Sequence, residues 1–136
     1  MAVDRVELVK KGYVAWNNGD RTWVLEHMSP DVEWSTPQGD PDPGTYRGHK
    51  AVVGFWEQWR ASVGQLVFEP EEFIESGEHL IVVARRTGKG ETSGLEVSDQ
   101  VIQVFTFEGD QCVRVHEFYD RAEAMRYAGA EELAEQ

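Results

Sequence analysis

Hydrophobic residues recur at helical spacing in two stretches of the chain. The first stretch begins near the N-terminus, ends at the run Asn17-Asn18-Gly19, and has its apolar positions at Val6, Val9, Tyr13 and Trp16. The second spans His49–Val63 and carries one apolar stripe made of Val52, Phe55, Trp56, Trp59 and Val63. Both patterns predict amphipathic helices. Between them, Asp20 can cap a short helix that runs through Met28 and is ended by Ser29-Pro30.

The remaining pattern is strand-like. Residues 31–36 alternate, with Val32, Trp34 and Thr36 on one face. Residues 37–48 are rich in Pro and Gly and predict a loop. Four further strands are predicted at residues 65–75, 79–87, 95–107 and 112–119. The short turns between them favour an antiparallel meander.

Helices therefore come first and strands follow, an order typical of an α+β domain. We expect one domain over residues 1–136, shaped as a cone-like α+β barrel in which three N-terminal helices cover one face of a strongly curved antiparallel sheet. Helices laid on a bent sheet leave a hollow, so a pocket is expected between them. A short helix over residues 121–127 closes the chain, and Asp120 with Glu123 has the D-x-x-E spacing of its N-terminal cap.

Composition excludes several classes of function. The chain of 136 residues has a net charge of -12, which disfavours a nucleic-acid partner. No apolar run is long enough to span a membrane, and the single cysteine fits a cytoplasmic protein without internal disulfides. We find neither zinc-like Cys/His spacing nor a Gly-rich phosphate loop that opens a helix, so no metal or cofactor is expected.

Several short motifs, together with the order of elements, resemble those of the nuclear transport factor 2-like cone fold and, more narrowly, of its SnoaL-like family. The motifs are YVAWNNGD (13–20), DVEW (31–34), YRGH (46–49), Ser93-Gly94 and VHEFYDRAEAMRYAG (115–129). The resemblance covers almost the whole chain. It implies the fold more strongly than the function, because this fold hosts isomerases, cyclases, epoxide hydrolases and binding proteins without activity.

Ketosteroid isomerases of this superfamily carry a general-base aspartate before a proline at the end of the first strand. The resemblance places Thr36 there, and a threonine cannot act as the base. It places Gln103 where the family has a protonated aspartic acid in its oxyanion hole, and an amide can still donate a hydrogen bond. The family's oxyanion tyrosine falls near Gly12, one residue from Tyr13.

Two other templates centre on the last strand. Epoxide hydrolases of the limonene type use an Asp-Arg-Asp arrangement. The resemblance places its arginine at Ala84, its first aspartate at Arg86 and its last-strand aspartate at Glu117, so that arrangement is broken. Polyketide cyclases of the SnoaL type need an acid/base on the inner sheet, which Glu117 can supply, with Asp99 as a second candidate. This template is the least contradicted of the three.

Glu117 is the strongest catalytic candidate from strand alternation alone. Val113, Val115, Glu117 and Tyr119 share one face, and the two valines indicate that it faces the core. Burial in an apolar pocket raises the pKa of a carboxyl group, which suits proton exchange near neutral pH. A structural ion pair between Glu117 and Arg86, or an outward orientation of the strand face, stay open as alternatives.

The sequence thus favours a pocket for a small, mostly apolar molecule, bound without catalysis; the alternative is a cofactor-independent acid/base enzyme of the cyclase or isomerase type. We expect the ligand to contact Tyr13, Trp16, Trp34, Thr36, Trp56, Trp59, Arg86, Gln103, Phe105 and Tyr119. Arg85, Arg114 and Phe118 give the outer face an amphipathic character, which predicts a homodimer through that face.

Overall fold

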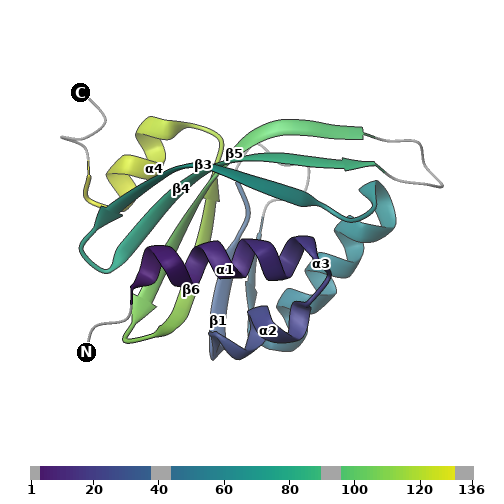
Figure 1. The fold of residues 1–136 in the computed structure, drawn as a ribbon, viewed down its shortest axis with the longest axis horizontal. Coiled ribbons are helices and arrows are strands. Elements are labelled where there is room, and N and C mark those ends of the chain that lie inside the picture. The colour runs from purple at the N-terminus through teal and green to yellow at the C-terminus, as the bar shows by residue number, and fades with distance from the viewer. Residues whose placement is uncertain (1–3, 38–43, 90–95, 131–136) are drawn as a thin grey trace.

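The structure is a computed structural model that describes residues 4–37, 44–89 and 96–130 (Figure 1). The motif Ser93-Gly94 therefore lies outside the described residues. Within those three ranges, no helix is long and apolar enough to cross a membrane.

Four helices form, close to where the periodicity places them. They are α1 (Arg5–Asn17), α2 (Arg21–Glu26), α3 (His49–Val63) and α4 (Arg121–Tyr127). The predicted cap of α2 is confirmed, because the Asp20 side chain accepts a hydrogen bond from the backbone N–H of Trp23. The predicted end of α2 is wrong. Met28 already belongs to a strand and is paired with Cys112, so the helix stops at Glu26.

Six strands form one sheet in the order β2-β1-β6-β5-β4-β3. They are β1 (Met28–Ser35), β2 (Thr45–Arg47), β3 (Val67–Ser76), β4 (His79–Lys89), β5 (Glu96–Glu108) and β6 (Gln111–Phe118). The antiparallel meander from β3 to β6 is confirmed.

The first two strands depart from the prediction. Strand β2 forms inside the segment predicted to be a loop and pairs antiparallel with β1. Strand β1 pairs with β6 in parallel, so the sheet is mixed rather than wholly antiparallel. A parallel pair needs a long connection between its strands, and the chain from β1 to β6 supplies it through α3 and the meander.

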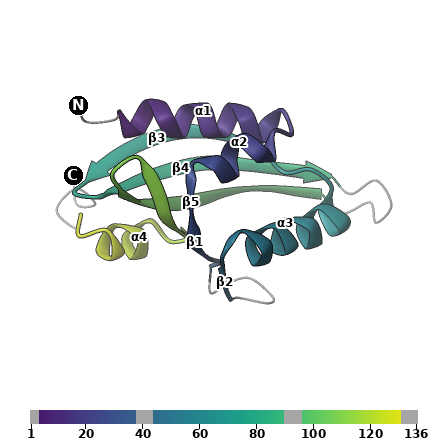
Figure 2. The same cartoon turned by 90° about the horizontal axis from the view of Figure 1, so that it is seen from below.

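The sheet carries a hydrophobic layer on each face. Alternation along β4 sends Leu80 and Val82 to the inner face and Ile81 and Val83 to the outer face, and all four are buried. Helices α1, α2 and α3 border the inner layer, whereas α4 packs on the outer layer with the fully buried Met125. Figure 2 shows α1 and α4 on opposite sides of the strands. The expectation that the three N-terminal helices cover one face is confirmed, and α4 covers part of the other face.

The N-terminal cap of α4 is confirmed. Asp120 has an extended backbone, and its side chain accepts a hydrogen bond of 2.9 Å from the backbone N–H of Ala122. This acid at the end of β6 thus serves the local change from strand to helix, by satisfying a donor that the helix leaves free.

Replacing Asp120 with alanine should lower the free energy of unfolding by about 1 kcal/mol, because the cap is lost. Urea denaturation of the wild type and the variant measures the difference. Glu123→Ala is the matched control, since Glu123 lies exposed in the first turn of the same helix and should matter less. Equal losses in the two variants would contradict the capping role.

Candidate functional site

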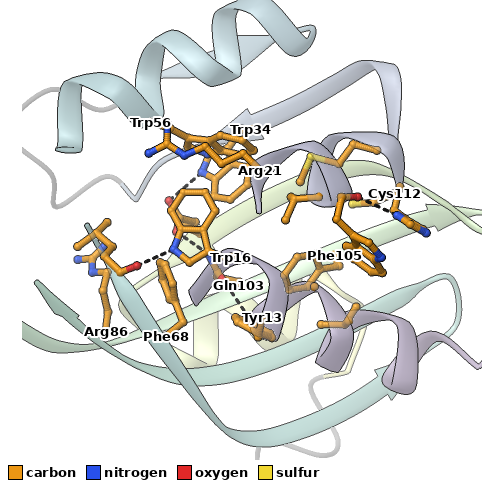
Figure 3. A pocket seen from close by; sticks show the side chains of 18 of the residues that line it. Tyr13, Trp16, Arg21, Trp34, Trp56, Phe68, Arg86, Gln103, Phe105 and Cys112 are labelled. Carbon is orange, nitrogen blue, oxygen red and sulfur yellow. Dashed lines mark hydrogen bonds between the residues drawn. The ribbon is translucent and has the colours of Figure 1, made fainter. Parts of the chain in front are cut away.

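A cavity of about 100 Å³ lies between the helices α1, α2 and α3 and the inner face of the sheet (Figure 3). Its volume is of the order of the ~150 Å³ apolar cavity that admits benzene in an engineered protein. Aromatic side chains dominate its walls: Tyr13, Trp16, Trp23, Trp34, Phe55, Trp56, Trp59, Phe68, Phe105 and Phe107. Such walls suit a flat, apolar molecule.

The tryptophans hold one another in fixed orientations. The ring of Trp56 meets Trp16 at 4.9 Å and 79° and Trp34 at 5.7 Å and 84°, which are edge-to-face contacts. The indole N–H of Trp16 donates to the carbonyl oxygen of Leu66 at 2.6 Å. Contacts between protein groups thus fix the orientation of this part of the wall.

A line of hydrogen bonds crosses the aromatic lining (Figure 3). The hydroxyl of Tyr13 donates to Oε1 of Gln103 at 2.7 Å, and Nε2 of Gln103 donates to Oε2 of Glu117 at 2.9 Å. The indole N–H of Trp34 donates to Oε1 of Glu117 at 3.0 Å. Gln103 and Glu117 face each other across β5 and β6, so sheet register places the amide beside the carboxylate.

Glu117 is buried, with 4% of its surface exposed, and lines the cavity. The two hydrogen bonds that its carboxylate accepts stabilise the charged form, whereas burial without such donors would destabilise it. Burial, and then the nearby charge of Glu117, raise the pKa of Tyr13 well above its usual value. Tyr13 therefore stays protonated and acts as a hydrogen-bond donor at any ordinary pH.

Arg86 is a buried cation at the edge of this network. Its Nε and Nη2 atoms donate to the two carboxylate oxygens of Asp99 at 2.9 and 2.7 Å, and Nη2 also donates to the hydroxyl of Tyr119 at 3.0 Å. Burial by itself would lower the pKa of Arg86, but hydrogen bonds to Asp99 and Tyr119 and the charge of Glu117 raise it. The hydrogen-bonded ion pair of Arg86 is thus made with Asp99, and Glu117 contributes through its charge.

The structure brings most of the predicted site residues together around the cavity. Those that line it are Tyr13, Trp16, Trp34, Trp56, Trp59, Arg86, Gln103, Phe105 and Glu117. Three others do not line it. Thr36 is buried, but its hydroxyl exchanges hydrogen bonds with the backbone of Gly44. Asp99 forms an ion pair with Arg86, and its side chain is 38% exposed. Tyr119 lies beyond the end of β6 and is 41% exposed.

A β-bulge changes which residues of β6 face inward. The pairing runs from Thr106 with Arg114 to Phe107 with Cys112, so Val113 is the extra residue. Cys112, rather than the predicted Val113, therefore faces the cavity. Burial raises the pKa of its thiol to about 12, so the thiol stays protonated and is a poor nucleophile.

Sequence reasoning missed several polar residues of the lining, namely Arg21, His27, Arg60 and Gln65. A signal existed for Arg60, which follows Trp56 by four residues and thus shares its helix face. Arg21 is the first residue and His27 the C-terminal cap of a helix of six residues, which is too short for a reliable periodic pattern. In the described part of the chain, no three His, Cys, Asp or Glu side chains form a group that could hold a metal ion.

The SnoaL-like domain family matches residues 9–115, most of the chain. The protein belongs to the SnoaL-like family. A search of curated proteins finds no match. The cone fold and the resemblance expected from the sequence are both confirmed, and the outcome agrees with solved structures of related shape.

Three such structures illustrate the range of this SnoaL-like protein's neighbours. A nuclear transport factor 2-like protein of unknown function from Burkholderia pseudomallei is 29% identical, with 93% of this chain and 98% of that one covered and a TM-score of 0.76. TerC, co-crystallised with polyporic acid, is 25% identical, with 90% and 95% covered and a TM-score of 0.74. A putative SnoaL-like polyketide cyclase from Jannaschia sp. is 21% identical, with 92% and 91% covered and a TM-score of 0.71.

Proposed function

We propose that this SnoaL-like protein binds a small, flat, mostly apolar organic molecule in its cavity. The observation that carries the proposal is a cavity of about 100 Å³ with aromatic walls and one hydrogen-bonded polar line, Tyr13–Gln103–Glu117. Apolar walls with a few fixed polar groups are the usual design of small-molecule sites. The crystal structure of TerC with polyporic acid supports an organic ligand for a protein of this shape.

A cavity-filling variant tests this proposal. Gly12 lies on the α1 wall, where an added Cβ would stand 3.6 Å from the ring of Trp23, so the longer side chain of Gly12→Leu should project into the space for a ligand. We expect Gly12→Leu to weaken binding of a planar aromatic probe such as polyporic acid by about tenfold or more. Quenching of tryptophan fluorescence measures binding, since four tryptophans besides Trp23 line the cavity.

Gly54→Leu is the matched control. Gly54 lies exposed on α3, and no atom lies within 4 Å of a Cβ added there. The control should bind as the wild type does. A wild type that quenches with no saturable component, or equal affinities in the two leucine variants, would refute binding in this cavity.

Acid/base catalysis of the cyclase or isomerase type is the second candidate. Its supporting observation is the Glu117 carboxylate, held by the donors of Trp34 and Gln103 inside an apolar cavity. A positioned carboxylate next to a bound carbon acid can take up and return a proton without any cofactor. A steroid isomerase reaction lacks its base, because Thr36 is bonded to Gly44 away from the lining.

The homodimer and the cytoplasmic location stay predictions. Because α4 covers part of the outer face, self-association through that face would rely on its uncovered part, where Arg85 is exposed and Arg114 is half-buried. Arg114 donates a hydrogen bond to the hydroxyl of Tyr127, a residue of α4, so α4 also contacts the part of the face around Arg114.

A further inference from the structure

Arginine side chains collect around the cavity of a strongly acidic protein. The whole chain carries 25 acidic and 13 basic residues. The cavity lining reverses this ratio: it contains three arginines, Arg21, Arg60 and Arg86, and one carboxylate, Glu117. A solvated surface with the average composition of this chain would show the opposite sign, so the lining differs from the rest of the molecule in charge.

Two donor groups of the lining, the Trp56 indole and the Arg60 guanidinium, have no hydrogen-bond partner among the described residues. The indole N–H of Trp56 is buried and has no hydrogen-bond partner there. Arg60 forms no ion pair or side-chain hydrogen bond among the same residues, whereas Arg21 is bonded to Glu57 at 2.7 Å and Arg86 to Asp99. Buried N–H groups are nearly always paired in folded proteins, so an unpaired one beside a cavity points to a missing acceptor.

The two unused donors belong to the same helix face. Trp56 and Arg60 are four residues apart on α3, which places them one turn from each other, and both line the cavity. The other tryptophan donors near the polar line are satisfied, that of Trp34 by Glu117 and that of Trp16 by Leu66. An acceptor group on a ligand can therefore pair with the donors of Trp56 and Arg60 on α3. It is not expected beside Glu117, because the negative charge of that carboxylate would repel an anionic acceptor.

We infer that the ligand carries an acidic oxygen group, a carboxylate or an enolate, received by the Trp56 indole N–H and the Arg60 guanidinium. The inference rests on the proposed binding function and adds the chemical class of the ligand. The guanidinium supplies charge-assisted donors to such an oxygen group, and the indole supplies one further donor. The flat apolar body of the ligand lies against the aromatic walls, so recognition is divided between an anionic end and an apolar remainder.

Two probes of one shape test the inference: 2-naphthoate and the neutral 2-naphthamide, titrated by calorimetry at pH 7. The wild type should bind the carboxylate about tenfold more tightly than the amide, since a hydrogen bond to a charged group exceeds one between neutral groups. Arg60→Gln and Trp56→Phe should each weaken binding of the carboxylate by about tenfold and of the amide by less than about threefold.

Arg126→Gln is the control, because Arg126 is an exposed arginine on α4 at the outer face of the sheet. It should leave the affinity for both probes unchanged. Arg60 is also exposed, so its variant folds even if Trp56→Phe lowers stability. Equal affinity for the two probes, unaffected by Arg60→Gln, would overturn the inference while leaving the proposed binding function in place. Binding of neither probe would overturn both.

Discussion

Replacing Asp99 with alanine should lower the free energy of unfolding by about 2–4 kcal/mol, since it leaves a buried cation without its carboxylate. The guanidinium of Arg86 is only 4% exposed and is held by both oxygens of Asp99. The expected loss is smaller than for a fully buried pair. The Asp99 side chain is 38% exposed, so water can replace part of its interaction with the Arg86 guanidinium.

A second substitution separates the loss of charge pairing from the loss of packing. In Asp99→Ala/Arg86→Met the buried cation is gone, and most of the stability should return. Glu72→Ala is the control, because Glu72 pairs with Arg121 at the surface, where both side chains are 44% exposed; it should cost less than about 1 kcal/mol. Chemical denaturation of the four proteins gives the comparison. An Asp99→Ala variant as stable as Glu72→Ala would contradict the role of the pair.

Glu117→Gln should leave stability within about 1 kcal/mol of the wild type, because the hydrogen bonds can rearrange and the cost of a buried carboxylate is removed. The new amide keeps an oxygen for Trp34, and Gln103 can turn its own amide so that Tyr13 accepts instead of donating. Glu117→Leu removes both acceptors and leaves the donors of Trp34 and Gln103 unpaired, so we expect a loss of roughly 2–4 kcal/mol.

The same pair of variants bears on catalysis. If the cavity performs acid/base chemistry, Glu117→Gln should lower turnover by ~10²–10⁴-fold, since the amide cannot exchange a proton. Turnover is followed with a substrate found by the binding experiments, and the thermal midpoint of each variant is measured alongside. A stable Glu117→Gln variant with full turnover would remove Glu117 from catalysis. Equal destabilisation by Gln and Leu would make it a structural residue, and Asp99 could not replace it, because Asp99 does not line the cavity.

Local periodicity was sufficient for most of the elements. The stripe through Val52, Phe55 and Trp56 predicted α3, and the alternation along β6 predicted that Glu117 faces the core. These patterns depend on residues two to four positions apart, and the chain itself supplies that information. The SnoaL-like motifs added the cone fold, which the pattern alone left as one of several α+β arrangements.

Local patterns failed where a position depends on distant partners. Met28 continues a helical pattern but is taken by β1, where Cys112 pairs with it from the far end of the chain. The bulge at Val113 exchanges the inward residues of β6 and brings Cys112 into the lining. Nothing within a few residues of either position specifies these outcomes, because strand pairing and bulges are set between strands.

The sequence by itself thus determined the order of the helices and of every strand except β2, the inward orientation of Glu117, and the cap at Asp120. Only the tertiary structure decided which carboxylate holds Arg86, that Tyr13 reaches Glu117 through Gln103, that α4 lies on the outer face, and that Trp56 keeps an unpaired N–H beside Arg60. The physical reason is the separation along the chain of the residues that determine each feature. Periodicity within an element reflects near neighbours along the chain, whereas the partner of a buried charge or donor is set by strand register and helix packing between residues 13 to 90 positions apart.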